Sequence, residues 1–223
     1  MLVASSLEQK VNKAKALLKQ YATSEYLRDS NIPMLSKSVF SLAQQFSSAP
    51  ALWQQYLSPV NVKFLTILNS TATTELAVAE LRQQYEQKQL AIKGDFYNKV
   101  ESNPLTLEQR LSVIRDNDKN LVLAAAGTGK TSVMIAKSLD LIAHNTVKPE
   151  QILILAYNKN AANELKARFE QRAKHAGLKV KAPSILTFHA LGLKLLQSAE
   201  TSRLWFLNLQ LTPCYLINGL PSG

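Results

Sequence analysis

The sequence predicts an α/β protein in which a parallel sheet flanked by helices follows a mostly α-helical N-terminal region. After residue 104, three short apolar segments alternate with helical patterns, which is typical of a parallel sheet covered on both faces. Before that residue, apolar side chains recur at helical spacing. The three apolar segments are Leu121–Ala125, Ile152–Ala156 and Ser184–Phe188.

Residues 1–104 are expected to form a helical extension with a long helical arm. Apolar residues recur at helical spacing from Leu7 to Tyr21, and a short helix is expected at 35–46 after the break at Pro33. A longer helical pattern covers residues 73–102 and is interrupted at Gly94. A single helix of that length would span roughly 45 Å, which suggests an arm or a coiled hairpin.

Residues 105–200 are expected to form the sheet-containing domain, with the boundary marked by Asn103-Pro104. The helical patterns predict helices at 107–114, 130–143, 161–174 and 189–197. The connections between parallel strands are expected to be right-handed. Residues 201–223 are apolar and rich in turn formers without a clear period, so we expect a divergent C-terminal tail.

The composition places the chain among globular proteins, with 46% hydrophobic and 19% charged residues. The one cysteine, Cys214, excludes an internal disulfide framework and suits a reducing compartment, so a cytoplasmic location is expected. No secretory signal and no membrane-spanning segment are predicted, and no membrane partner is expected.

The net charge of +10 favours a polyanionic partner. Basic residues are densest between positions 159 and 181, where only Glu164 and Glu170 oppose them. The seven basic residues are Lys159, Lys166, Arg168, Arg172, Lys174, Lys179 and Lys181. A solvated helix face is the alternative interpretation of this run.

The run from Ala124 to Thr131 predicts a phosphate-binding loop between a strand and a helix. Gly127 and Gly129 allow the backbone to turn so that successive N–H groups point at an anion. Lys130 can reach the β- and γ-phosphates, and the Thr131 hydroxyl can ligate Mg²⁺. The expected cofactors are therefore ATP and Mg²⁺; a glycine-rich turn that binds nothing is the alternative.

Gln109 lies on the short helix expected before the loop. Its amide can donate to and accept from an adenine edge at the same time. A solvated glutamine on a helix surface is the alternative for this residue taken alone.

Polar and aromatic side chains follow the second and third strands, at the end of a parallel sheet where ligands bind. They are Tyr157, Asn158 and Lys159 after the second strand, and Thr187, Phe188 and His189 after the third. An aromatic ring can stack on a base, and a lysine can face a phosphate. Strand ends that carry helix caps, with a histidine on a partly apolar face, are the alternative.

These motifs, in this order, resemble the N-terminal part of a superfamily 1 DNA helicase of the UvrD/Rep type. The resemblance covers about residues 95–198 and implies a partial RecA-like domain with ATP-dependent, 3′ to 5′ DNA unwinding. It has departures: the full loop pattern begins with glycine where this chain has Ala124, and many relatives carry arginine where it has Ser132.

The resemblance also implies roles for individual residues. Gln109 would read adenine, and Thr131 would ligate Mg²⁺. The ATP-binding set would be Gln109, Ala126, Gly127, Thr128, Gly129, Lys130, Thr131 and Ser132. The path of single-stranded or partially duplex DNA would be lined by Tyr157, Asn158, Lys159, Thr187, Phe188 and His189.

Hydrolysis in this family uses an Asp-Glu pair, and the 223 residues contain none. Asp140 falls inside the helix after the loop and is expected to face away from it. We therefore expect a truncated or frameshifted helicase that binds nucleotide and DNA without unwinding. Two alternatives stay open: a single-stranded DNA-binding module with a vestigial nucleotide site, and a small-molecule P-loop kinase.

Overall fold

The structure is a computed structural model that describes residues 2–70, 74–125 and 127–201. The chain forms two compact units. The first, called the helical unit, consists of Met1–Ala91 together with Asp116–Asp118. The second, called the α/β unit, consists of Ile92–Arg115 together with Lys119–Gly223. The tail expected at 201–223 lies outside the described residues, apart from Thr201.

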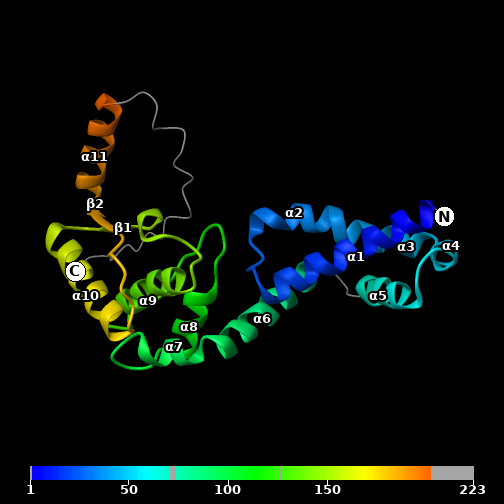
Figure 1. The fold of residues 1–223 in the computed structure, drawn as a ribbon, viewed down its shortest axis with the longest axis horizontal. Helices are drawn as coiled ribbons and strands as arrows, with labels where there is room; N and C mark the ends of the chain where they lie inside the picture. Colours follow the sequence, from blue (N-terminus) through cyan, green and yellow to red (C-terminus); the bar gives the residue numbers. More distant parts are fainter. Residues whose placement is uncertain (1, 71–73, 126, 202–223) are drawn as a thin grey trace. The chain divides into compact units, whose positions relative to one another are not determined.

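The helical unit is built from helices that begin where the sequence carries proline or polar breaks (Figure 1). Pro33, Pro50 and Pro59 each lie in the first turn of a helix, where the missing N–H costs nothing. The elements are α1 (Leu2–Thr23), η1 (Asp29–Asn31), α2 (Ile32–Leu35), the π-helical η2 (Ser36–Phe40), α3 (Ser41–Ser48), α4 (Pro50–Gln54), α5 (Pro59–Ser70) and α6 (Thr74–Ile92).

The core of the helical unit is formed by apolar residues from α1 to α6. Val11, Leu27, Leu35, Val39 and Leu65 are fully buried in one cluster. Burial of such side chains stabilises a fold by about 1.5–3 kcal/mol each. The expected helical character of this region is confirmed.

The prediction of a long helix over 73–102 is wrong in one respect: the chain forms two helices there. Helix α6 ends at Ile92, and α7 (Gly94–Lys99) begins after Lys93 leaves helical geometry at φ −101° and ψ 11°. Tertiary contacts explain the break: Lys93 Nζ pairs with the buried Asp140 carboxylate at 2.9 Å, and Tyr97 of α7 is fully buried.

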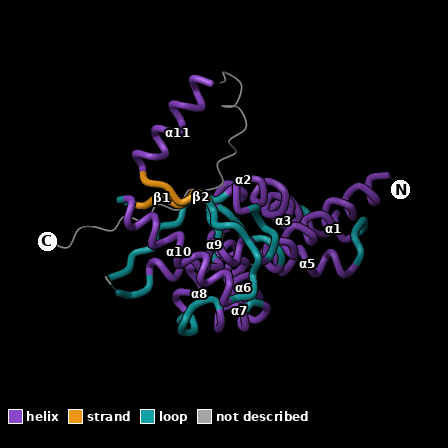
Figure 2. Tube along the Cα trace, turned by 60° about the vertical axis from the view of Figure 1, so that its left-hand side comes forward, coloured by secondary structure: helices purple, strands orange, loops and turns teal. Residues whose placement is uncertain are grey.

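The α/β unit combines helices with two parallel strands (Figure 2). After α7 its elements are α8 (Leu107–Ile114), α9 (Lys130–Ala143), η3 (Pro149–Gln151), β1 (Leu153–Ala156), α10 (Lys159–His175), β2 (Ser184–Thr187) and α11 (Phe188–Thr201). Strands β1 and β2 pair from Leu153 with Ser184 to Ala156 with Thr187. Helix α10 packs against both strands and against α9, and α9 also packs against α8.

The first expected strand, Leu121–Ala125, is not a strand in the structure. Leu121 and Leu123 are 79% and 85% exposed, and none of the described segments forms a ladder with this stretch. An apolar pattern predicts a strand only if a neighbour supplies hydrogen bonds to its backbone, and here β1 and β2 pair only with each other among the described residues. The parallel sheet therefore has two described strands instead of three.

Within the described part of the chain, no helix is both long enough and apolar enough to cross a membrane.

Candidate nucleotide and nucleic-acid site

The loop before α9 has the backbone geometry of an anion-binding turn. Gly127 and Gly129 both adopt left-handed conformations, with φ of 78° and 91°. Gly129 is the N-cap of α9, and the Thr128 hydroxyl donates to the Ala125 carbonyl oxygen at 2.7 Å. A left-handed residue followed by a right-handed one, as at Gly129 and Lys130, turns successive N–H groups to one side, and the 14-residue helix adds the positive end of its dipole. Ala126, an expected cofactor contact, lies outside the described residues.

Lys130 holds its ammonium group over this loop. Its Nζ atom donates to the carbonyl oxygens of Ala124 and Ala125 at 2.9 Å and 2.8 Å. An anion that accepts from the loop amides would meet this charge directly. The sequence-predicted lysine is thus placed beside the glycine turn by its own helix.

The structure brings Gln109 to the same loop. Gln109 forms a capping box at the start of α8, in which its Oε1 accepts from the Thr106 amide at 2.9 Å. Its Nε2 donates to the Thr128 carbonyl oxygen at 3.0 Å. A Cβ atom added at Gly129 would lie 2.6 Å from this Nε2, so Gln109 would have to shift, and the φ of 91° independently favours glycine there.

Lys137, which the sequence analysis did not select, joins the two helices that carry this site. It lies on α9, is buried, and donates through Nζ to the carbonyl oxygens of Val113 and Arg115 at 2.7 Å and 3.1 Å. These carbonyls lie at the end of α8, where backbone acceptors lack partners within the helix. Gln109 therefore joins the start of α8 to the loop, and Lys137 of α9 joins the end of α8 to α9.

A buried carboxylate that the sequence analysis also did not select binds two arginine side chains of α10, and one of these contacts the start of α9. The side chain of Glu101 is 4% exposed and accepts from Arg168 Nη2 at 3.3 Å and 3.4 Å, and Arg172 Nε lies 2.9 Å from it. Arg168 Nη2 also donates to the hydroxyl of Ser132 at 2.8 Å. Ser132 directly follows the loop threonine, so the Arg168 guanidinium group lies beside the start of the loop helix.

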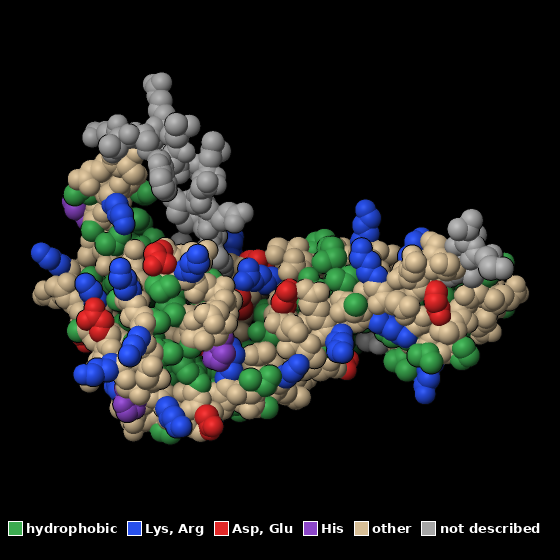
Figure 3. Space-filling model, in the orientation of Figure 1, with side chains coloured by type: hydrophobic (Ala, Val, Ile, Leu, Met, Phe, Trp, Pro, Cys, Tyr) green, Lys and Arg blue, Asp and Glu red, His purple; other side chains and the backbone are tan. Residues whose placement is uncertain are grey.

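Because of these ion pairs, fewer residues of the basic run are available to bind a polyanion than the sequence suggests. Of the seven in the basic run, Arg168 and Arg172 are partly buried and paired with Glu101. The other five are exposed: Lys159, Lys166, Lys174, Lys179 and Lys181. Lys and Arg side chains are spread over this face of the α/β unit (Figure 3).

The residues expected to contact DNA meet at one edge of the sheet. Because Ala156 pairs with Thr187, the chain leaves both strands at the same edge into Tyr157 and Phe188. Tyr157 is 91% exposed and Phe188 is 51% exposed, an arrangement that leaves both rings available for stacking.

The neighbouring polar residues at this edge have helix-capping contacts. The Asn158 side chain accepts from the Ala161 amide at 2.8 Å, and the Thr187 hydroxyl accepts from the Ala190 amide at 3.1 Å. The alternative interpretation of these two residues as caps is therefore correct as far as their contacts go. Lys159 and His189 are exposed beside them.

The donor set of the loop suits a triphosphate carrying Mg²⁺. It offers backbone amides, one ammonium group and the Thr131 hydroxyl, and Thr131 is partly buried at the start of α9. Asp140 is turned away from this set, because its carboxylate pairs with Lys93 and lies 3.1 Å from His144 Nδ1. The described residues contain no group of three or more His, Cys, Asp or Glu side chains that could hold a metal ion.

Comparison with known proteins agrees with the resemblance expected from the motifs. Residues 105–210 match the family model described as the UvrD/REP helicase N-terminal domain. This range includes α8, the phosphate loop and the edge of the sheet with Tyr157 and Phe188.

Individual relatives match over part of the chain. DNA helicase IV of Escherichia coli (strain K12) is 38% identical over 126 residues, which are 56% of this chain and 18% of that protein. ATP-dependent DNA helicase SRS2 of Saccharomyces cerevisiae is 36% identical over 93 residues, 41% of this chain and 8% of that protein. ATP-dependent DNA helicase Rep of Buchnera aphidicola subsp. Schizaphis graminum is 38% identical over 94 residues, 42% of this chain and 14% of that protein. The chain thus spans less than one fifth of the length of these relatives.

Proposed function

Since residues 105–210 match the N-terminal domain of UvrD/REP helicases, we propose that the α/β unit is the N-terminal part of a RecA-like ATP-binding domain in an ATP-dependent DNA helicase. The observation that carries the proposal is the contact of Gln109 with Thr128 across Gly129, which joins an amide side chain to a phosphate-binding turn.

In this proposal the loop amides of Gly127 to Thr131 bind the triphosphate, and Lys130 turns from the carbonyls of Ala124 and Ala125 to the phosphates. The Thr131 hydroxyl ligates Mg²⁺, which neutralises phosphate charge when bound. Gln109 reads the adenine edge through the amide that now contacts the loop. Ser132, with Arg168 bonded to its hydroxyl, completes the set around the start of α9.

The DNA-binding part of the proposal rests on the sheet edge. Tyr157 and Phe188 stack on bases of a single strand, while Lys159 and His189 lie beside them to meet the backbone. The activity proposed for the whole protein is 3′ to 5′ unwinding of partially duplex DNA, in line with the UvrD/Rep resemblance. Lys159, exposed at this edge, adds a salt-dependent attraction for the strand.

We propose further that these 223 residues by themselves bind nucleotide without sustained turnover. Turnover needs a carboxylate to hold Mg²⁺ and another to orient water, and the sequence has no Asp-Glu pair. Within the α/β unit, the two buried carboxylates described here, Glu101 and Asp140, are already engaged by cationic side chains.

A titration with a fluorescent ATP analogue in the presence of Mg²⁺ tests the nucleotide site. The purified chain should show saturable binding that unlabelled ATP displaces, and Lys130→Ala should weaken it by at least about tenfold, since a charge-assisted contact to phosphate contributes about 1.5–3 kcal/mol. Lys166→Ala, which removes an exposed lysine of α10, is the matched control and should bind normally. Equal affinity in the Lys130→Ala variant would reject the proposed site, and DNA binding without any nucleotide binding would favour the vestigial alternative.

A further inference from the structure

A three-residue segment between α8 and the phosphate loop belongs to the helical unit by its contacts. This segment, Asp116–Asp118, is called the strap. The chain on either side of it, up to Arg115 and from Lys119, belongs to the α/β unit. The strap is therefore the one stretch of the α/β sequence that is packed as part of the helical unit.

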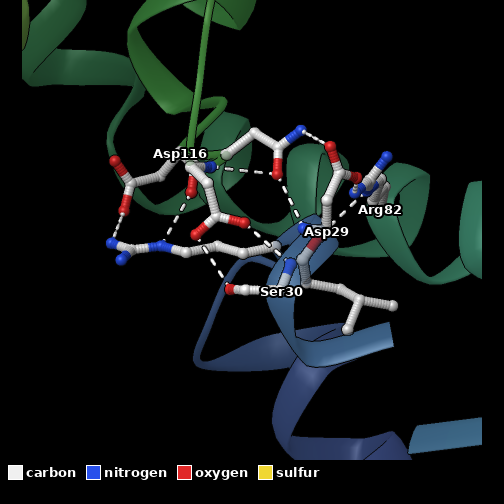
Figure 4. Close-up of polar contacts among 8 residues, drawn as sticks. Asp29, Ser30, Arg82 and Asp116 are labelled. Atoms are coloured by element: carbon white, nitrogen blue, oxygen red, sulfur yellow. Dashed lines mark hydrogen bonds and ion pairs between the residues drawn. The ribbon is translucent and has the colours of Figure 1, made fainter. Parts of the chain in front are cut away.

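Three consecutive residues of the helical unit hold the three residues of the strap in order (Figure 4). Arg28 Nη2 pairs with the Asp116 carboxylate at 2.5 Å, and Arg28 Nε donates to the Asp116 carbonyl oxygen at 3.0 Å. The Asp29 amide donates to Asn117 Oδ1 at 2.8 Å, and Asn117 Nδ2 donates back to the Asp29 carboxylate at 2.6 Å.

The third pair completes this set. The Ser30 amide and hydroxyl donate to the two carboxylate oxygens of Asp118 at 2.7 Å and 2.8 Å. Arg82 of α6 holds the segment of the helical unit that contacts the strap. It donates to the Asp29 carboxylate at 2.6 Å and to the Leu27 carbonyl oxygen at 2.9 Å. Every strap residue thus has its own side-chain partner. These pairs align the strap with residues 28–30 in one register, and a shift by one residue would break all three.

Electrostatics agree with this geometry. The hydrogen bond from Arg82, followed by that from Asn117, lowers the pKa of Asp29. The Ser30 amide and hydroxyl lower the pKa of Asp118. Both carboxylates are therefore held in their charged, hydrogen-bond-accepting form at neutral pH.

The strap is also the direct covalent link between the two parts of the proposed nucleotide site. It begins two residues after the end of α8, which carries Gln109, and it ends three residues before Leu121, where the chain leads into the phosphate loop. Lys137 holds the carbonyls of Val113 and Arg115 just before the strap. A change in the path of the strap is therefore passed to α8 and the Lys137 contacts on one side and, through residues 119–125, to the loop on the other.

We propose that Arg28, Asp29 and Ser30 are positioning residues for nucleotide binding: by holding the strap, they keep Gln109 and the phosphate loop aligned for one ligand. This inference rests on the proposed function, because it assigns these residues to the same nucleotide site. It gives the helical unit a role in nucleotide affinity.

A comparison of two ligands separates positioning from a merely structural role. ATP engages both Gln109 and the loop, whereas inorganic tripolyphosphate engages the loop alone. Arg28→Ala in the full chain should weaken ATP binding about fivefold, as expected for a coupling of about 1 kcal/mol, and should leave tripolyphosphate affinity within about twofold. Both dissociation constants come from displacement of the fluorescent ATP analogue.

Two further variants keep the test decisive. Ser30→Ala removes only one hydroxyl bond to Asp118 and should shift the ratio of the two affinities in the same direction, even if Arg28→Ala folds poorly. Lys13→Ala removes an exposed cation of α1 and should not change the ratio. An unchanged ratio in Arg28→Ala and Ser30→Ala, including equal weakening for both ligands, would overturn the inference while leaving the nucleotide site intact. Failure of the unaltered chain to bind either ligand would instead overturn the proposed function and this inference with it.

Discussion

Gln109 Nε2 donates to the carbonyl oxygen of Thr128 at 3.0 Å, so the first turn of α8 is hydrogen-bonded to the proposed phosphate-binding loop. The contact lies against Gly129, where any added Cβ would come within 2.6 Å of the glutamine amide. The capping box at the start of α8 and the glycine turn before α9, which are separate in sequence, are thus in direct contact.

Gly129→Ala is expected to disrupt this structure more than an ordinary glycine replacement. At φ 91° an alanine adds about 1–2 kcal/mol of backbone strain, and its Cβ also displaces Gln109. Gly177→Ala is the matched control, since Gly177 has φ 72° but nothing within 4 Å of an added Cβ. Affinity for the fluorescent ATP analogue should fall in the first variant and stay unchanged in the second. Equal affinities in the two variants would show that Gln109 and the loop do not depend on each other.

Glu101→Gln should destabilise the α/β unit. The substitution leaves Arg168 and Arg172 near a neutral amide, and the loss is about 2 kcal/mol, below the usual range for a buried pair because both guanidinium groups keep partial access to water. Denaturant unfolding measures the change, with the exposed Glu164→Gln on α10 as control. A loss no larger than that of the control would mean that the Glu101 network contributes nothing to stability.

The contacts of the strap should weaken in acid. The pKa values of Asp29 and Asp118 are lowered, chiefly by Arg82 and by Ser30; the charge of Arg28 further lowers the pKa of Asp118, and the charge of Asp29 raises it. A carboxyl with a lowered folded-state pKa stabilises the fold fully at pH values above its ordinary value of about 3.9, and this stabilisation is lost as the pH falls through the folded-state pKa.

Asp118→Asn measures this effect. The free energy of unfolding of the unaltered chain should exceed that of the variant at pH 6, and the difference should shrink below about pH 4, near the ordinary pKa of aspartate. In a Ser30→Ala background the pH dependence of the difference should be smaller, because one of the two Ser30 hydrogen bonds to Asp118 is gone. A difference that grows on acidification would have the wrong sign for this account.

Tyr157→Ala and Phe188→Ala should each reduce affinity for single-stranded DNA by about fivefold or more, since stacking contributes about 1–3 kcal/mol per base. Tyr56→Ala is the matched control, because Tyr56 is an exposed aromatic residue that belongs to the helical unit and not to the α/β unit. Fluorescence anisotropy with a labelled oligonucleotide provides the measurement at two salt concentrations. A loss in the Tyr56→Ala variant as large as in the other two would show that stacking at this edge is not what binds DNA.

Local signals made the two helices of the proposed nucleotide site predictable from sequence. The predicted bounds 107–114 and 130–143 coincide with α8 and α9, because a capping box at Thr106 and a glycine N-cap at Gly129 define their starts through contacts within a few residues. The strand predicted at Leu121–Ala125 failed for the opposite reason, since its existence depends on hydrogen bonds to a distant neighbour.

Contacts between distant segments were not predictable in the same way. No periodicity connects Glu101 to Arg168, or Arg28 to Asp116, because these pairs depend on how helices pack. Lys137 did leave a signal: it lies among Ile135, Ala136 and Leu139 in a largely apolar stretch of the helix, where a buried lysine needs acceptors. A charged residue on a buried helix face is thus the clue that could have identified it.

The most direct measurement of the central claim is amide NMR of the chain titrated with ATP and Mg²⁺. The account predicts that the backbone amides of Gly127, Gly129, Lys130 and Thr131, together with the Gln109 side-chain amide, shift in a saturable way with one dissociation constant. In Lys130→Ala the remaining resonances should shift only at ATP concentrations at least about tenfold higher. Saturable shifts confined to other parts of the chain, with these five groups unmoved, would contradict it.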